Sequence, residues 1–178
     1  DSLATGVFVG RHREMEMITG AVEDAISGQG RVVTIAGEHG IGKTRIAQEA
    51  AVYAELRGTG VLWGRCYEEG GTPPYWPWVK PIRECINLSD PEELRTRMGL
   101  GAADIAEVIP EVRQILTNLD APPVLEPEQA RFRLFDSITI FLKSVAQTQP
   151  LVLVLDELHW ADKPSLLLLE FLARQLAE

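Results

Sequence analysis

The sequence lacks a hydrophobic run long enough to cross a membrane. The strongest candidate, Leu151 to Leu155, is far shorter than the roughly 18 apolar residues that a spanning helix needs. A basic N-terminal region followed by an apolar core, the pattern of a secretory signal peptide, is also missing. The two cysteines, Cys66 and Cys85, fit no metal or redox spacing. We therefore expect a cytoplasmic protein in which both thiols act as small apolar residues.

Positive charge is scarce as well, since 17 Lys and Arg residues stand against 26 Asp and Glu residues, for a net charge of −9. This balance argues against binding of this segment to nucleic-acid backbones, which requires clustered basic residues. The 178 residues, 46% of them hydrophobic, are enough for one domain with its own core. The chain begins with Asp1 and stops within an amphipathic pattern, so we expect it to be an excerpt of a longer protein.

One short segment matches the phosphate-binding P-loop pattern G-x-x-x-x-G-K-[ST] at every defined position. Its glycines allow backbone N–H groups to point inward and form a nest for phosphate oxygens at a helix N-terminus. Lys43 is expected beside the β- and γ-phosphates, and the Thr44 hydroxyl is expected to ligate Mg²⁺. The predicted nucleotide-binding residues of this region are Gly37, Glu38, His39, Gly40, Ile41, Gly42, Lys43, Thr44 and Arg45.

The flanks of this segment favour the strand, loop and helix that a P-loop needs. Residues 31–36 form a short segment rich in β-branched residues, which predicts a buried strand. Residues 45–56 have helical composition and then meet Gly58 and Gly60, which are helix stop signals. Upstream, apolar residues recur at helical spacing over 15–26, which predicts an amphipathic helix.

The remaining chain contains further predicted strands and helices. Residues 61–66 predict a strand, and residues 68–78 predict an irregular loop because prolines and glycines interrupt them. Its two tryptophans, Trp76 and Trp78, are interpreted as anchors, with base stacking as the weaker alternative. Residues 79–118 predict helices, divided by Pro110.

The last third of the chain combines a long helix with a strand and a final helix. A helix is predicted over 128–147, a strand buried on both faces over 151–155, and a last helix from a cap at Asp162 to Leu176. The predicted core face of the long helix comprises Phe132, Phe135, Ile138, Leu142 and Val145. Alternation of strands and helices with a parallel sheet is typical of the α/β class.

A second chemical motif lies where the strand at 151–155 ends. Ligands of α/β folds bind at the carboxyl ends of parallel strands, and Asp156 and Glu157 follow this strand directly. Asp156 is expected to hold Mg²⁺ together with Thr44. Glu157 is expected to act as the general base that activates the attacking water. For His159 two interpretations remain, sensing of the γ-phosphate or packing and hydrogen bonding, of which the second is favoured.

Five segments carry a resemblance to a known family. They are Phe8-Val9-Gly10-Arg11 with Glu14, GEHGIGKT at 37–44, GRCYEEGGTPPYWPW at 64–78, ARFRLFDSI at 130–138 and LVLVLDELHWAD at 151–162. Together they span most of the chain and resemble the AAA-type ATPase module of bacterial STAND regulators. In these large signal-transduction ATPases the module is joined to LuxR-type DNA-binding domains, nucleotide cyclase domains or kinases.

The resemblance implies a P-loop NTPase fold, a three-layer αβα arrangement with a parallel sheet. Residues 1–178 would form the N-terminal part of the ATPase domain, with a helical insertion at 79–149. The relatives continue with a strand that carries a polar or arginine sensor and then with a helical lid, both expected beyond Glu178. That strand would lie between 31–36 and 151–155.

Site residues can be carried over from the family by position. Lys43 and Thr44 match the phosphate and Mg²⁺ residues, Asp156 the second Mg²⁺ residue and Glu157 the catalytic base. Val9, Gly10 and Arg11 match the segment that lies near the adenine in such proteins.

The leading functional hypothesis is an ATP-dependent regulatory switch that uses ATP or ADP with Mg²⁺ and hydrolyses ATP slowly. Its expected partners are the adenine nucleotide and covalently linked sensor and effector domains, without direct contact to nucleic acid or membrane. Nucleotide-dependent self-association is compatible with this role. Two alternatives stay open: a motor or remodelling AAA ATPase, which needs an arginine finger, and a scaffold that holds nucleotide without cleaving it.

Overall fold

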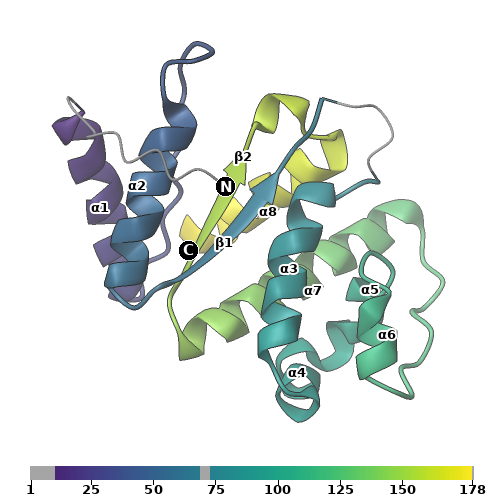
Figure 1. The fold of residues 1–178 in the computed structure, drawn as a ribbon. Helices are drawn as coiled ribbons and strands as arrows, with labels where there is room; N and C mark the ends of the chain where they lie inside the picture. The colour runs from purple at the N-terminus through teal and green to yellow at the C-terminus, as the bar shows by residue number, and fades with distance from the viewer. Residues whose placement is uncertain (1–10, 69–72, 178) are drawn as a thin grey trace.

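The computed structural model describes residues 11–68 and 73–177 as a mixed α/β fold that is mostly helical (Figure 1). Its helices and strands are α1 (His12–Ile26), α2 (Lys43–Leu56), β1 (Gly60–Arg65), α3 (Trp76–Leu88), α4 (Pro91–Met98), α5 (Ala102–Ile105), α6 (Glu111–Ile115), α7 (Pro127–Thr148), β2 (Leu151–Asp156) and α8 (Lys163–Ala177). Short 3-10 turns follow α4 at Gly99–Gly101 and β2 at Leu158–Trp160. Among the described helices, none is both long and apolar enough to cross a membrane.

The two strands β1 and β2 run parallel, with Gly60 opposite Leu151 and Arg65 opposite Asp156. Parallel neighbours need a long crossover connection, and α3 to α7 supply it. In Figure 1, α1 and α2 lie on one side of the strand pair, and α3 to α7 lie on the other. Because the strands are parallel, their carboxyl ends meet at one edge, where the predicted site residue Asp156 lies. The predicted α/β class is confirmed.

The hydrophobic core lies mainly among the crossover helices. Trp78 and Ile82 of α3 and Phe141 of α7 are fully inaccessible to solvent and belong to one cluster with residues of α4, α5 and α6. Leu62 joins this cluster from β1, whereas the leucines of β2 are only partly buried against it. The crossover helices are therefore the best-packed part of the described chain, and the strands lie at its margin.

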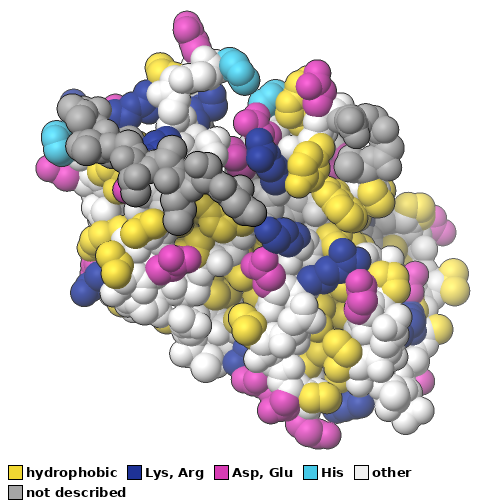
Figure 2. All heavy atoms as spheres, in the orientation of Figure 1, with side chains coloured by type: hydrophobic (Ala, Val, Ile, Leu, Met, Phe, Trp, Pro, Cys, Tyr) yellow, Lys and Arg dark blue, Asp and Glu magenta, His cyan; other side chains and the backbone are white. Residues whose placement is uncertain are grey.

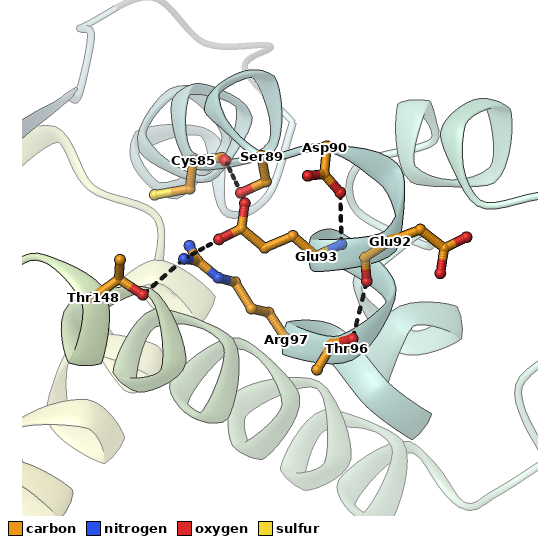
Figure 3. Close-up of polar contacts among 8 residues, drawn as sticks. All are labelled: Cys85, Ser89, Asp90, Glu92, Glu93, Thr96, Arg97 and Thr148. Atoms are coloured by element: carbon orange, nitrogen blue, oxygen red, sulfur yellow. Dashed lines mark hydrogen bonds and ion pairs between the residues drawn. The ribbon is translucent and has the colours of Figure 1, made fainter.

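A polar network fastens α4 to the end of α7 (Figure 3). Asp90 caps α4 by accepting a hydrogen bond of 2.8 Å from the Glu93 backbone N–H. The Arg97 guanidinium lies between the Glu93 carboxylate and the Thr148 hydroxyl, to which it donates at 2.9 Å. Since Glu93 takes part through both its backbone and its side chain, the cap of α4 and its bridge to α7 form one connected unit.

The strand predicted at residues 31–36 does not form, and that prediction is wrong. The segment has an irregular backbone, and Val32 and Val33 are 53% and 46% exposed. A β-strand exists through hydrogen bonds to a neighbouring strand. Among the described residues, β2 pairs with β1, and no strand lies beside residues 31–36. Apolar, β-branched composition alone therefore does not make this segment a strand without a neighbouring strand to pair with.

Burial of β2 on both faces is also not observed. Each of its residues, Leu151 to Asp156, is only partly buried. A central strand is covered because a neighbour flanks each edge and helices cover both faces. In the described chain β2 has β1 as its neighbour on one edge, so the full cover that its five apolar residues predicted is missing.

The loop predicted at 68–78 gives way to helix earlier than expected. The helix α3 begins at Trp76, with Pro77 in its first turn, where the missing N–H of proline has no helical partner to lose. Trp78 is the anchor that the composition predicted: it is fully buried, and its indole N–H donates to the Ser165 carbonyl at 3.2 Å. Trp76, in contrast, remains 36% exposed. Residues 69–72 of this loop lie outside the described residues.

The structure confirms most of the predicted core face of α7 and the predicted burial of the two cysteines. On α7, Phe135, Ile138, Leu142 and Val145 are buried as predicted, but Phe132 is 60% exposed and packs edge-to-face against Phe171 with ring centroids 5.6 Å apart. Cys66 and Cys85 are unpaired and buried, as expected. Burial raises the pKa of both thiols to about 11, so neither is a reactive thiolate at neutral pH.

Candidate nucleotide-binding site

The P-loop forms a turn that leads directly into α2. Gly40 and Gly42 have φ angles of 77° and 95°, in the left-handed region that residues with a Cβ atom adopt only at a cost. Gly42 is the last residue before the helix, and its carbonyl accepts a hydrogen bond of 3.1 Å from the Ile46 N–H. The turn therefore places Lys43 and Thr44 in the first helical turn, where the orphan N–H groups of a helix favour anions.

The Lys43 side chain bends back over this turn. Its ammonium group donates to the Gly37 carbonyl at 2.9 Å and to the Glu38 carbonyl at 2.8 Å. An ammonium group has three N–H donors, so one remains for a further acceptor. The charge of Lys43 is thus held against the backbone of the loop that the sequence predicted to bind phosphate.

The side chains of the loop itself point to solvent. Glu38 and His39 are exposed, and Ile41 is 49% exposed. Their contribution to a phosphate site would therefore come from the backbone. Arg45 forms an ion pair of 2.5 Å with Glu49, one turn further along α2.

Thr44 and Asp156 lie 112 positions apart in the sequence and meet across the site. The Thr44 hydroxyl is 3.2 Å from both carboxylate oxygens of Asp156. Asp156 reaches this position because it ends β2, and one of its oxygens also accepts a hydrogen bond of 3.0 Å from the Glu157 N–H. A hydroxyl and a carboxylate are hard oxygen donors, the type that Mg²⁺ prefers, so this pair fits the ion that the sequence implied.

Glu157 has an unusual backbone. Its φ and ψ are 59° and 39°, a left-handed conformation that costs a non-glycine residue about 1–3 kcal/mol. Its side chain is 27% exposed, with one carboxylate oxygen 3.4 Å from His159 Nδ1. The His159 ring lies beside Trp160, with centroids 5.0 Å apart. His159 therefore pairs and packs, which agrees with the favoured interpretation, and its partner is the predicted base.

Arg11 also reaches the P-loop. Its guanidinium donates a hydrogen bond to the Ile41 carbonyl, 30 residues further along the chain. The other two residues predicted near the adenine, Val9 and Gly10, lie outside the described residues. Of this segment, the structure therefore brings Arg11 to the site.

One connection that sequence reasoning missed ties the Trp-Pro-Trp segment to the region after β2. Asp162 caps α8, as predicted, by accepting hydrogen bonds from the Ser165 N–H at 2.9 Å and hydroxyl at 2.6 Å. Asp162 Oδ1 also lies 3.4 Å from the Tyr75 N–H, just before α3. Asp162 and Pro164 predict the cap from the local sequence. The contact of Asp162 with Tyr75 could not be predicted in this way, because the two residues are 87 positions apart.

Comparison with known proteins agrees with this geometry. Residues 7–178 match the AAA ATPase domain family, so the chain belongs to that family of nucleotide-binding ATPases. It is also 25% identical over 186 aligned residues to an uncharacterized protein of Rhizobium meliloti (strain 1021), an alignment that covers 97% of this chain. The chain spans 18% of the length of that relative. No solved structure matches the chain.

Proposed function

We propose that this chain binds ATP or ADP with Mg²⁺ and that, in the intact protein, it hydrolyses ATP slowly as a regulatory switch. The observation that carries the proposal is the meeting of the Thr44 hydroxyl with the Asp156 carboxylate at 3.2 Å, beside a P-loop whose Lys43 faces inward. Membership of the AAA ATPase family supports the nucleotide and the reaction.

Each site residue has a separate proposed role. The backbone N–H groups of residues 37–44 would cradle the phosphates, and Lys43 would offset the charge of the β- and γ-phosphates. Thr44 and Asp156 would hold Mg²⁺, which supplies electrostatic stabilisation of the transferred phosphoryl group when bound. Glu157 would orient the attacking water and accept its proton as oxygen bonds to the γ-phosphorus and the bond to the β-phosphate oxygen breaks. Arg11 would support the loop at Ile41.

The dependence of ATP affinity on Mg²⁺ tests the proposal. In the intact protein, calorimetry with a slowly hydrolysed ATP analogue should show tighter binding with Mg²⁺ than with EDTA. Thr44→Val keeps the side-chain shape but removes the hydroxyl, so it should abolish this difference. Thr96→Val, which alters an exposed hydroxyl on α4, is the matched control and should keep it. Absence of ATP binding, or the same affinity with and without Mg²⁺, contradicts the proposal.

A second candidate is a scaffold that holds nucleotide without cleaving it. The observation in its favour is the contact of the Glu157 carboxylate with His159 at 3.4 Å, since this contact occupies an oxygen that the proposed base needs for the attacking water. Single-turnover measurement of phosphate release by the intact protein separates the two, because a scaffold retains its bound ATP.

The proposed context follows the resemblance to STAND regulators. We place the chain in the cytoplasm, joined to sensor and effector domains that the nucleotide state would rearrange. Within it, residues 1–178 would form the N-terminal part of the ATPase domain, with residues 79–149 as a helical insertion. A match over 18% of a much longer relative is compatible with such a multidomain setting.

A further inference from the structure

A cavity adjoins the candidate metal site. It has a volume of about 480 Å³, within the range of small-molecule sites, and lies between α2, α3 and the carboxyl end of β1. Thr44 and Asp156 form part of its wall, but its lining includes none of the P-loop residues 37–43. The cavity therefore begins where the predicted metal ligands lie and leads away from the phosphate nest.

Three aromatic side chains line this cavity. Trp63 comes from β1, Tyr67 from the segment just after it, and Trp76 from the start of α3. Tyr67 is 52% exposed and Trp76 is 36% exposed, so both present ring surface to the open space. Three accessible rings around one cavity are suited to a flat apolar group, which could stack on them.

The aromatic wall depends on a close approach of α3 to β1. A Cβ atom at Gly64 would lie 1.9 Å from the Pro77 carbonyl oxygen, so only glycine permits the first turn of α3 to lie against the strand. This contact fixes Trp76, the neighbour of Pro77, beside the strand that carries Trp63. Trp63 and Trp76 are thus held by β1 and α3, and Tyr67 joins them from the segment after β1.

Three cationic side chains line the same cavity: Arg65 at the end of β1, and Lys80 and Arg83 on one face of α3. Arg83 forms an ion pair of 2.7 Å with Glu111, but its buried Nε–H has no hydrogen-bond partner in the described structure. Lys80 is 3.8 Å from Glu84. Arg65 is exposed and forms no ion pair with another described residue.

The lining itself carries more cations than carboxylates, although Glu84 and Glu111, outside it, pair with two of these cations. Three cations face the cavity against one carboxylate, Asp156, in a protein with a net charge of −9. In Figure 2, several Lys and Arg side chains lie in the middle of the face with acidic side chains next to them, and further acidic side chains line the lower edge. Clefts lined by one sign of charge concentrate ligands of the other sign.

We propose that this cavity is a binding site for a small planar aromatic acid, distinct from the nucleotide. The ring stacks among Trp63, Tyr67 and Trp76, and the carboxylate pairs with Lys80 and Arg65, with the Arg83 Nε–H as a further donor. Because Thr44 and Asp156 border both sites, the acid and the Mg²⁺–nucleotide change each other's affinity by the same factor. The acid is therefore an effector of the proposed switch, but its binding does not require that switch to exist.

The test uses 2-naphthoate as the probe and neutral 2-naphthalenemethanol as its matched control. Binding to the intact protein, saturated with Mg-ADP, is measured by calorimetry and by saturation-transfer NMR. We expect 2-naphthoate to bind at least about tenfold more tightly than the alcohol, because only the acid pairs with the cations. Equal affinities, or no binding of 2-naphthoate to the ADP-saturated protein, overturn the proposal.

Three variants locate the probe. Lys80→Gln, Arg65→Gln and Trp76→Leu alter partly or fully exposed side chains, so each should fold, and each should weaken 2-naphthoate binding about fivefold or more. Lys143→Gln, on α7 and outside the cavity lining, should leave it unchanged. Affinity for the ATP analogue, measured in the same variants, separates this proposal from the proposed function. Loss of probe binding in Lys143→Gln, or retention in all three cavity variants, contradicts the assigned site.

Discussion

The Thr44 hydroxyl lies 3.2 Å from both carboxylate oxygens of Asp156, although 112 residues separate them. This contact joins the first turn of α2 to the end of β2. It brings the P-loop and the acidic residues after β2 together in one site. A local pattern could predict each half, because each depends on the residues that immediately surround it. The contact itself follows from the strand direction, since ligand-binding residues of α/β folds gather at carboxyl ends of parallel strands.

Replacement of Lys43 tests the phosphate side of the site. Lys43→Ala removes the charge that the loop carbonyls of Gly37 and Glu38 hold in place. In the intact protein, we expect the affinity for Mg-ATP to fall at least about tenfold, or about 1.4 kcal/mol, by calorimetry. Lys143→Ala, on α7, is the control and should bind as the wild type does. Equal affinities for Lys43→Ala and the wild type would refute the P-loop assignment.

Replacement of Glu157 tests the chemical step. Glu157→Gln removes the proton acceptor but keeps the shape and most ground-state contacts, so ATP affinity should persist while turnover falls about 100-fold. Phosphate release by the intact protein, measured under single-turnover conditions, reports this loss. Glu55→Gln, an exposed position on α2, should hydrolyse ATP at the wild-type rate. Normal turnover in Glu157→Gln would assign the base to another residue.

The sequence predicted the residues that meet at the candidate site more completely than it predicted the strands of the sheet. The P-loop and the pair Asp156 and Glu157 were predictable because glycine spacing and an apolar run before two acids are local patterns. The strand expected at residues 31–36 was not, because a strand depends on a partner elsewhere in the chain. The contact of Asp162 with Tyr75 was missed for the same reason, since it joins two loops through tertiary packing.

The cavity beside β1 could not be predicted from the sequence, for a different reason. Its lining residues come from separate elements, and no spacing in the sequence relates Arg65 or Trp63 to Lys80. The composition predicted no cluster of basic residues, because a net charge of −9 gives no information on where the cations lie in the fold. Trp76 was interpreted as an anchor like Trp78, but in the structure Trp76 is 36% exposed whereas Trp78 is fully buried.

The close contact of β1 with α3 predicts a strong effect at Gly64. In Gly64→Ala the new methyl group would overlap the Pro77 carbonyl oxygen, at 1.9 Å, and backbone would have to move. We expect a loss of about 1–3 kcal/mol or more in the free energy of unfolding, measured by urea denaturation. Gly20→Ala, in α1 with no atom within 4 Å, is the matched control and should be neutral or stabilising. Similar stability of the two variants would mean that α3 does not lie against β1.

The link between α1 and α2 predicts a dependence on pH. Glu23 accepts hydrogen bonds from the Arg57 guanidinium at 2.7 and 2.8 Å and from the Tyr53 hydroxyl at 2.7 Å. The bond from Arg57 and then that from Tyr53 lower the pKa of Glu23 from 4.5 to about 2. Because the folded state lowers this pKa, the link stabilises fully above pH 4.5 and is lost as the pH falls towards 2.

The variant Glu23→Gln isolates this effect from the other carboxylates. The difference in melting temperature between the wild type and Glu23→Gln should be largest above about pH 4.5 and should shrink as the pH falls towards 2. Both proteins share every other titrating acid, so the difference reports Glu23. A difference that stays constant over this range would show that the Glu23 charge does not support the α1–α2 contact.

The free edge of β2 leads to the last prediction. Among the described residues, 31–36 are irregular and pair with no strand, Val32 and Val33 are about half exposed, and β2 pairs with β1 along one edge. Unpaired backbone groups and exposed β-branched side chains favour addition of a strand. We propose that in the intact protein a further strand, from outside this chain, lies between residues 31–36 and β2 and converts residues 31–36 into a strand.

Hydrogen–deuterium exchange can detect this conversion. Amides of residues 32–36 should exchange quickly in the isolated 178-residue chain, because none of the strands in its described part pairs with them. They should exchange at least about tenfold more slowly in the intact protein, where the added strand would accept their hydrogen bonds. Amides of β1 that already pair with β2 serve as the internal control and should be protected in both. If residues 32–36 exchange equally fast in the two proteins, no strand is added beside them, and β2 keeps an open edge in the working molecule.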